Sequence, residues 1–210
     1  MDTPEPSGSE DVGAEVVERL SELVAAKTTD LADTIMQVPL DAYRDPERHA
    51  AEVDTIFRSS PIAAAPTGQI PNPGDYTVID VVDRQLLISR DDAGESHVFL
   101  NYCTHRGATI SSGHGCSKRH TCPYHGWSFD SAGALVGIPG AEGFDQLDRS
   151  TAGLVELPSK EAHGFVWCCL DGTTEVDLEA HLGPFAAELD RWEYDKFVSK
   201  AVMDLSLIHI

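Results

Sequence analysis

The sequence predicts a mainly β protein, an antiparallel sandwich or small barrels, with helices at its N- and C-terminal ends. Three observations lead to this prediction: short runs of β-branched and aromatic residues, turn sequences between them, and helical periodicity confined to the two ends. A chain of 210 residues holds one medium domain, or a small domain and part of another. Its 41% of hydrophobic residues are enough to form a buried core.

The N-terminal part begins with a segment that resembles disordered chain in composition. Residues 1–13 are acidic and rich in Pro and Ser. Beyond them Val16, Leu20 and Leu23 recur at helical spacing. This periodicity predicts an amphipathic helix over residues 14–26.

A second helix is expected to begin after Asp45. That residue suits an N-cap, and Pro46 suits the first helical position. The apolar face of this helix continues to Phe57. Four prolines between residues 59 and 74 then predict a loop or extended chain.

The central part of the sequence has the periodicity of strands. Short β-rich runs alternate with turn sequences such as Asp91-Asp92-Ala93-Gly94. After Asp171 the pattern becomes helical again. The expected strands are residues 76–82, 85–89, 97–101, 127–129, 135–138, 154–157 and 165–170, and the expected C-terminal helices are residues 178–182 and 185–192.

The chain is strongly acidic, with 15 Lys and Arg against 35 Asp and Glu and a formal net charge of −20. Such a surface repels phosphate groups, so neither nucleic acid nor a membrane is expected as a partner. No stretch approaches the ~18 apolar residues of a membrane span, and no basic segment followed by an apolar run marks a secretory signal. Five cysteines without disulfide-scaffold spacing favour a reducing, cytoplasmic location.

Two short motifs carry the chemistry, and each contains one cysteine and one histidine. Cys103 and His105 form the first pair, and Cys122 and His125 form the second. Two such loops side by side can hold a two-iron cluster, with two thiolates on one iron and two imidazoles on the other. The alternative is a zinc site. Structural zinc sites usually pair ligands of one kind, so the mixed pairs favour an iron–sulfur cluster.

The sequence around these pairs resembles the Rieske domain of ring-hydroxylating oxygenase large (α) subunits. The resemblance runs from about residue 38 to residue 170. It rests on the two motifs and on flanking sequences: Cys103-Thr104-His105-Arg106-Gly107-Ala108, Cys122-Pro123-Tyr124-His125-Gly126-Trp127, Tyr43-Arg44-Asp45-Pro46, Ile56-Phe57, Pro73-Gly74-Asp75-Tyr76, Asn101-Tyr102-Cys103, Phe129-Asp130 and Gly137-Ile138-Pro139.

The resemblance implies a role for each motif residue. The two thiolates are expected on an inner iron, and the two imidazoles on an outer iron from which electrons leave. Three further residues are expected to shape the loops around the ligands, although packing alone is an equally weighted role for the last two: Arg106, Tyr124 and Trp127.

The same residues distinguish this chain from respiratory-chain Rieske proteins. Those proteins tie the two loops by a disulfide, but the corresponding positions here are Ala108 and Tyr124. They also carry a serine that donates a hydrogen bond to a cluster sulfur, where this chain has Trp127. Without that donor the reduced cluster is less stabilised, so a low potential of about −150 mV is expected.

The other cysteines and histidines lack ligand spacing. Cys116 lies between the motifs without a suitably spaced histidine, and Cys168 and Cys169 lie in an apolar strand, where they are expected to be buried. The remaining histidines are expected to be structural or exposed to solvent: His49, His97, His114, His120, His163 and His181.

The resemblance also implies an enzyme larger than this chain. In the family a second domain holds a mononuclear Fe(II) through two histidines and a carboxylate. Residues 171–204 contain a single histidine, His181, and so cannot supply this set. This chain is therefore expected to pass electrons from an NADH-dependent reductase or a ferredoxin to an iron site that it lacks. Family members form trimers, some with β subunits. The alternative is a stand-alone Rieske ferredoxin, which would not need the helices on either side of the β domain.

Five segments are expected along the chain. They are an acidic extension with one helix, a lead-in helix and loop, the Rieske domain, the start of a truncated catalytic domain and a tail: residues 1–37, 38–66, 67–172, 173–204 and 205–210. The tail coincides with the translation of a transposase adaptor used for sequencing libraries. The hypothesis that it is an artefact fails if the parent gene encodes it.

Overall fold

The computed structural model describes residues 9–200, and their side chains from residue 13 onward. It divides the chain into two compact units, Met1–Asp45 and Pro46–Ile210, called unit 1 and unit 2 below. The five-segment division stays a prediction, and its last segment lies outside the described residues.

Unit 1 contains helix α1, Ser9–Ala26, and a short 3-10 turn, Leu40–Tyr43. The predicted helix is confirmed, but it starts earlier than expected, so the expectation of disorder is wrong for residues 9–13. Acidic residues in that part of the sequence favour a helix N-terminus, because they complement the helix dipole. After the helix, Asp30 accepts a 3.1 Å hydrogen bond from the Arg19 guanidinium.

Unit 2 starts with helix α2, Pro46–Glu52, which continues into a π-helical turn, Val53–Phe57. The second predicted helix is therefore confirmed. Two more helices, α3 (Leu178–Leu182) and α4 (Phe185–Trp192), confirm the predicted C-terminal pair. Across residues 9–200, no helix combines the length and the hydrophobicity needed to cross a lipid bilayer.

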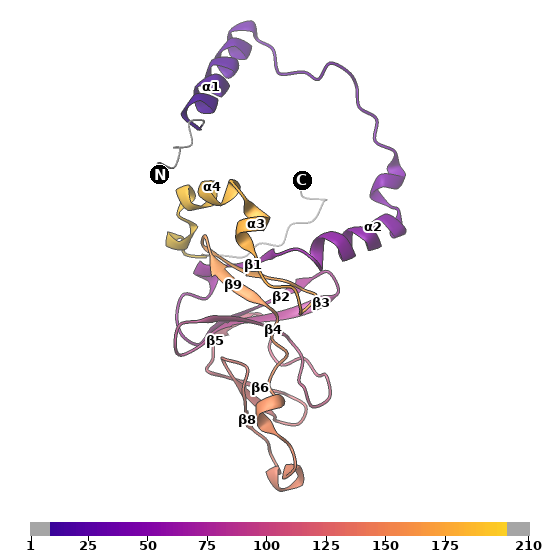
Figure 1. Cartoon of the computed structure of the whole chain (residues 1–210), viewed down its shortest axis with the longest axis vertical. Helices are drawn as coiled ribbons and strands as arrows, with labels where there is room; N and C mark the ends of the chain where they lie inside the picture. Colours follow the sequence, from indigo (N-terminus) through magenta and orange to yellow (C-terminus); the bar gives the residue numbers. More distant parts are fainter. Residues whose placement is uncertain (1–8, 201–210) are drawn as a thin grey trace, which may run out of the picture. The chain divides into compact units, whose positions relative to one another are not determined.

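The rest of unit 2 is built from three antiparallel sheets, as the sequence predicted. Their strand orders are β1-β10-β9, β4-β3-β2-β5 and β6-β7-β8. In Figure 1 the β6-β7-β8 sheet lies at the opposite end of unit 2 from β1 and β9. The strands are β1 Ile62–Pro66, β2 Asp75–Val81, β3 Arg84–Arg90, β4 Ser96–Leu100, β5 His114–Cys116, β6 Arg119–Thr121, β7 Ser128–Asp130, β8 Leu135–Gly137, β9 Ser159–Ala162 and β10 Phe165–Cys168.

The strand predictions differ from the structure at one predicted strand and at several short strands that had not been predicted. Strand β1 lies in the segment predicted as loop or extended chain, and it is the extended alternative. Pro66 is tolerated there because β1 is an edge strand and Pro66 stands at its end. Residues 154–157 form only an isolated bridge, between Glu156 and Phe99, instead of a strand. The short strands β5, β6 and β9 had not been predicted, because runs this short have no readable alternation.

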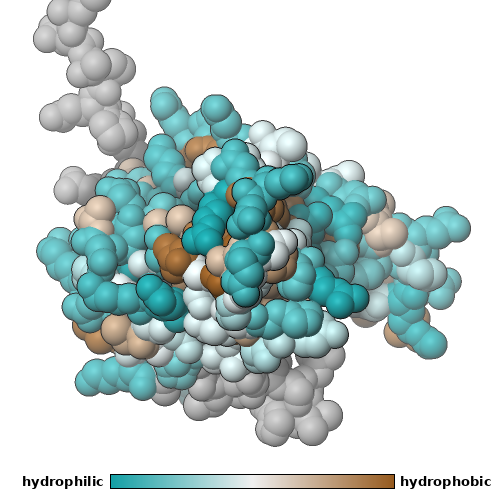
Figure 2. Space-filling view, turned by 90° about the horizontal axis from the view of Figure 1, so that it is seen from below, coloured by the Kyte–Doolittle hydropathy of each residue, from teal (hydrophilic) through white to brown (hydrophobic). Residues whose placement is uncertain are grey.

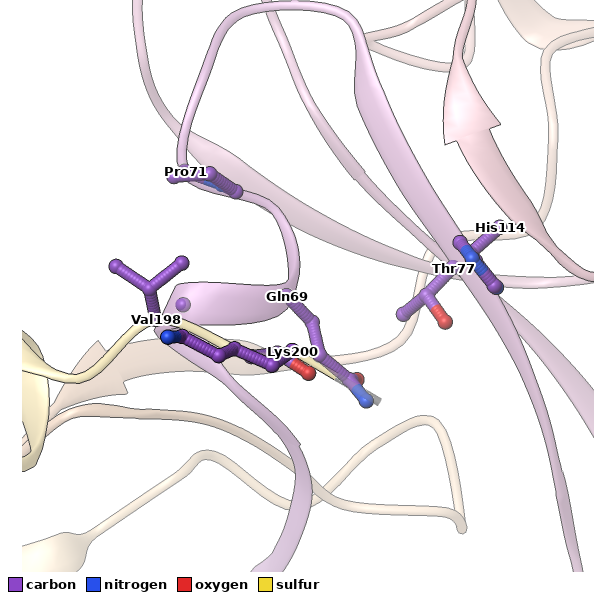
Figure 3. Close-up of a pocket in the computed structure, with 8 residues that line it drawn as sticks. Gln69, Pro71, Thr77, His114, Val198 and Lys200 are labelled. Carbon is purple, nitrogen blue, oxygen red and sulfur yellow. The ribbon is translucent and has the colours of Figure 1, made fainter. Parts of the chain in front are cut away.

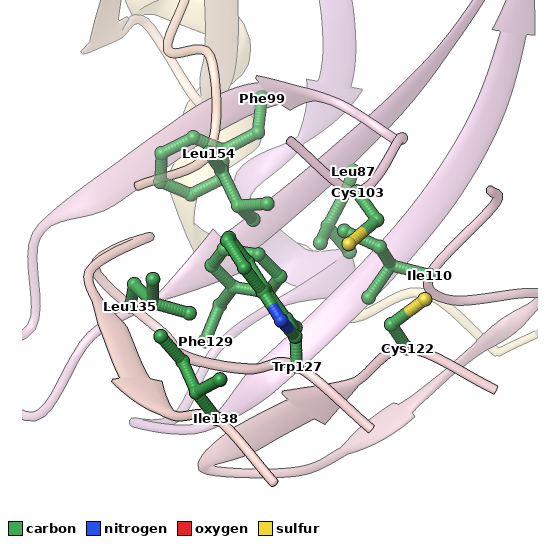
Figure 4. Close-up of a cluster of buried hydrophobic side chains, with 10 residues drawn as sticks. All are labelled: Leu87, Phe99, Cys103, Ile110, Cys122, Trp127, Phe129, Leu135, Ile138 and Leu154. Atoms are coloured by element: carbon green, nitrogen blue, oxygen red, sulfur yellow. The ribbon is translucent and has the colours of Figure 1, made fainter. Parts of the chain in front are cut away.

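The central strand β3 separates two hydrophobic cores. Its successive side chains point to opposite faces, so Leu86 and Ile88 join one core while Leu87 joins the other. Both faces are covered, so the strand is buried continuously from Leu86 to Arg90. The first core also contains Cys168, as predicted, and lies against β10. The second core contains Phe129 and extends to the loops that carry the Cys/His motifs (Figure 4).

A buried ion pair links two of the sheets. Arg90 on β3 is only 7% exposed, and its guanidinium donates to both carboxylate oxygens of Glu161 on β9, at 3.0 and 2.9 Å. The same guanidinium donates to the carbonyls of Ile70 and Gly94, both at 2.6 Å. Burial raises the pKa of Glu161, but the hydrogen bonds and the charge of Arg90 outweigh it and hold that pKa below its ordinary value.

Candidate metal centre

The two predicted motifs form loops of the same construction. The Cys103 N–H donates to the Ala108 carbonyl at 2.8 Å, and the Gly107 N–H donates back to the Cys103 carbonyl at 2.8 Å. The second loop repeats both bonds at the same spacing, from Cys122 to Trp127 and from Gly126 to Cys122, at 2.8 and 3.0 Å.

Each loop turns on a glycine in the left-handed region. Both Gly107 and Gly126 have φ of +74°, a conformation that side-chain-bearing residues rarely adopt. The first loop follows β4, and the second joins β6 to β7. Since each loop folds tightly back on itself, it presents a Cys and a His from one short segment.

The two cysteines are buried in the second core. Cys103 is 2% exposed and Cys122 is 3% exposed, and both pack with Leu87, Ile110 and Trp127. In Figure 4 their sulfur atoms point into the region beside Ile110. Burial raises the pKa of the Cys103 thiol and the adjacent Cys122 raises it further, against hydrogen bonds from nearby backbone N–H groups. Two thiolates this close require a compensating positive charge, which a bound metal supplies.

The two histidines lie with their ring centroids 4.8 Å apart, at an interplanar angle of 68°. His105 is half-buried, and its Nδ1 is fully buried with no hydrogen-bond partner. His125 is exposed, and the ring of Tyr124 stacks on it at 3.7 Å. A buried ring nitrogen without a hydrogen-bond partner is costly in an ordinary fold. A metal bound to this nitrogen would satisfy it.

The donor set fits a two-iron cluster better than a single ion. A structural zinc site needs four protein ligands around one position. A [2Fe–2S] cluster instead takes two protein ligands on each iron. The two buried thiols and the two neighbouring imidazoles offer that division.

The residues expected to shape the loops lie in different environments. The indole of Trp127 is 5% exposed and stacks on His105, with centroids 4.8 Å apart and an interplanar angle of 11°. Tyr124 is 60% exposed, and Arg106 is also exposed. Sequence reasoning missed Phe144, which lies edge-on to both His105 and Trp127. No spacing rule connects a loop residue so far along the chain with the ligand motifs.

The remaining cysteines and histidines differ in exposure and in their hydrogen-bond partners. Cys116 is exposed on β5, whereas Cys168 and Cys169 are fully buried, and burial raises the pKa of Cys168 to about 12. His120 is buried and shares a 2.8 Å hydrogen bond with Ser111. His97 lies within hydrogen-bonding distance of two carboxylates, those of Glu156 and Asp91.

A cavity of about 230 Å³ lies elsewhere in unit 2 (Figure 3). Its lining includes Gln69, Thr77, His114 and Lys200, and none of the four motif residues. The end of unit 2 that carries β6 and β8 is shown in Figure 2, where small hydrophobic areas lie among hydrophilic side chains. The candidate centre is built from the two motif loops at the second core, and the cavity is a separate feature.

Comparison with known proteins identifies the domain. Residues 60–152 match the family model described as Rieske [2Fe-2S] domain. The chain is 34% identical over 161 residues to the anthranilate 1,2-dioxygenase large subunit of Acinetobacter baylyi, a match that covers 75% of this chain and 34% of that protein. It is 32% identical over 171 residues to the N,N-dimethyl phenylurea N-demethylase subunit alpha of a Sphingobium strain, covering 77% of this chain and 37% of the relative.

Solved structures agree with the sequence matches. Naphthalene 1,2-dioxygenase from Rhodococcus sp. superposes with a TM-score of 0.67 at 30% identity, over 87% of this chain and 40% of that one. The chain therefore spans about a third of the length of the curated relatives it matches. Residues 60–152 are a Rieske [2Fe–2S] domain, homologous to that of the large subunits of ring-hydroxylating dioxygenases.

Proposed function

We propose that Cys103, Cys122, His105 and His125 hold the [2Fe–2S] cluster of this domain, the thiolates on an inner iron and the imidazoles on an outer one. One observation supports this proposal most directly: two loops of the same hydrogen-bonding pattern present two buried cysteines and two histidine rings 4.8 Å apart. When bound, the cluster accepts a single electron and releases it again.

Three neighbouring residues hold this arrangement. Trp127 fixes the plane of His105 by stacking on it, and Tyr124 does the same for His125 at the surface. Arg106, exposed beside His105, places a positive charge at the rim of the first loop. Because Trp127 offers no hydroxyl donor, we infer a reduction potential of about −150 mV, at the low end of the Rieske range.

We infer that the complete protein is the large subunit of a Rieske oxygenase. The similarity to anthranilate 1,2-dioxygenase extends over 161 residues, more than the Rieske match of residues 60–152 alone, which favours this reading over a stand-alone ferredoxin. In such a protein, electrons pass from the Rieske domain to a mononuclear Fe(II) that two histidines and a carboxylate hold outside this chain.

The partners of that complete protein follow from the same inference. Relatives carry names such as "Naphthalene 1,2-dioxygenase system, large oxygenase component", from a Ralstonia species, so they work within multi-component systems. We propose an NADH-dependent reductase, alone or with a ferredoxin, as the electron donor, and a trimer of large subunits, with or without β subunits, in the cytoplasm. The substrate class is an aromatic or related small molecule that is hydroxylated or demethylated.

The ligand assignment is tested by iron and acid-labile sulfide analysis of two variants that make the same chemical change. Cys122→Ser is expected to lose the cluster, because its thiolate is a ligand. Cys116→Ser, on exposed β5, is expected to keep it. Full cluster content in Cys122→Ser, or equal loss in both variants, would contradict the assignment. A potential well above zero would overturn the low-potential inference.

A further inference from the structure

The environments of the two histidine rings are unequal. His105 is enclosed by aromatic side chains: Trp127 stacks on it, and Phe144 meets it at an angle of 86° with centroids 6.0 Å apart. Phe144 is also 5.5 Å from Trp127 at 80°, so the three rings form one contiguous group. His125, by contrast, is exposed and has a surface tyrosine on one face.

The segment that carries Phe144 is tethered so that this ring faces inward. Gly140, with φ of +67°, starts a 3-10 turn over Ala141–Phe144, and its carbonyl accepts from the Gly143 N–H at 3.0 Å. Ala141, Phe144 and Leu147 are the residues of this segment that pack on the second core, while those between them are exposed. The segment is therefore a surface loop anchored by three apolar side chains.

A hydrogen bond joins the following residues directly to the first ligand loop. Thr104 lies one residue before His105, and its hydroxyl donates to the Ala152 carbonyl at 2.8 Å. Asp148 orders the chain between the two points, because its carboxylate accepts from the Ser150 N–H at 2.9 Å. The core packing of the Phe144 segment and the hydrogen bond from Thr104 thus keep Phe144 beside His105.

We propose that Phe144 is a positioning residue that closes the His105 side of the cluster to water and so keeps the reduction potential low. The proposal rests on the ligand assignment above. Reduction makes the cluster more negative, and water dipoles stabilise the more negative state when they can approach it. Trp127 covers one face of the imidazole, and Phe144 covers a further approach that the loop would otherwise leave open. Water then reaches the cluster mainly beside His125.

The test compares reduction potentials of cluster-loaded wild type, Phe144→Ala, Phe144→Tyr and Val78→Ala, measured by EPR-monitored titration. Phe144→Ala is expected to favour reduction at least threefold, which is about 28 mV for one electron. Phe144→Tyr keeps the ring and is expected to restore the wild-type potential. Val78→Ala removes part of a side chain that packs on the same core from β2, outside the loop of Phe144, and is expected to leave the potential unchanged.

A second variant and a second measurement keep the test decisive if Phe144→Ala binds too little cluster. Phe144→Leu retains more of the apolar volume and is expected to shift the potential in the same direction by less. Deuteron couplings in pulsed EPR after exchange into D2O are expected to grow in Phe144→Ala and Phe144→Leu. The inference fails if Phe144→Ala and Phe144→Leu match wild type, or if Val78→Ala shifts the potential as much as Phe144→Ala. If wild type itself gives no Rieske signal, the ligand assignment has failed instead.

Discussion

The ion pair between Arg90 and Glu161 is expected to contribute strongly to the stability of unit 2. Glu161→Gln keeps the size of the side chain but removes its charge and one of the two acceptor oxygens, because the amide NH2 group cannot accept from the guanidinium, which is 7% exposed. Removing one partner of a fully buried pair costs about 3–5 kcal/mol. The Glu161 side chain is 29% exposed, so water offsets part of that loss. We therefore expect a loss of about 2–3 kcal/mol.

The assay is urea unfolding at pH 7, followed by circular dichroism. Glu188→Gln is the matched control, because its pair with Arg191 is exposed and should be worth at most about 1 kcal/mol. Since the folded pKa of Glu161 is lowered, the stabilisation is complete above the ordinary value of 4.5 and is lost as the pH falls through the folded pKa. The difference between wild type and Glu161→Gln should therefore shrink in acid. A loss no larger than that of Glu188→Gln would refute the reasoning.

Two further predictions concern pH and loop geometry. The hydrogen bond to Glu156 and the contact with Asp91 outweigh burial and raise the pKa of His97. The contribution of His97 to stability is therefore complete below the ordinary value of 6.5 and is lost as the pH rises through the folded pKa. His97→Gln should flatten this decline in urea-unfolding midpoints, and an unchanged profile would argue against a stabilising role of the two carboxylates. Gly107→Ala and Gly126→Ala impose the same left-handed strain, about 1–2 kcal/mol, but only the second places a Cβ 2.8 Å from Pro139. Thermal unfolding should show Gly126→Ala to be the less stable variant, and equal melting temperatures would contradict this.

The sequence was most informative where a physical requirement is local. The Cys/His motifs were visible because one short loop must present both ligands, and Gly107 and Gly126 follow from the left-handed turn that such a loop needs. The central strands were predictable because short β-rich runs alternate there with turn sequences. In each case neighbouring residues along the chain carry the whole signal.

Features that depend on distant parts of the chain were missed. Strand β1 forms by pairing with β10, about a hundred residues later, so the prolines around it predicted only a loop or extended chain. Phe144 contacts His105 from a loop that packs on the second core and is joined to the motif by the hydrogen bond from Thr104 to Ala152. Neither pairing leaves a periodic pattern in the sequence, so a structure was needed to find them.

The most direct test of the central claim is EPR of the dithionite-reduced protein with nitrogen-15 in its histidines. If His105 and His125 are ligands, the protein will give a rhombic Rieske signal with couplings to two histidine nitrogens. His125→Cys will then lose one coupling or reshape the signal while the fold is retained. A signal without histidine couplings, a spectrum unchanged in His125→Cys, or a silent protein loaded with zinc would contradict the account.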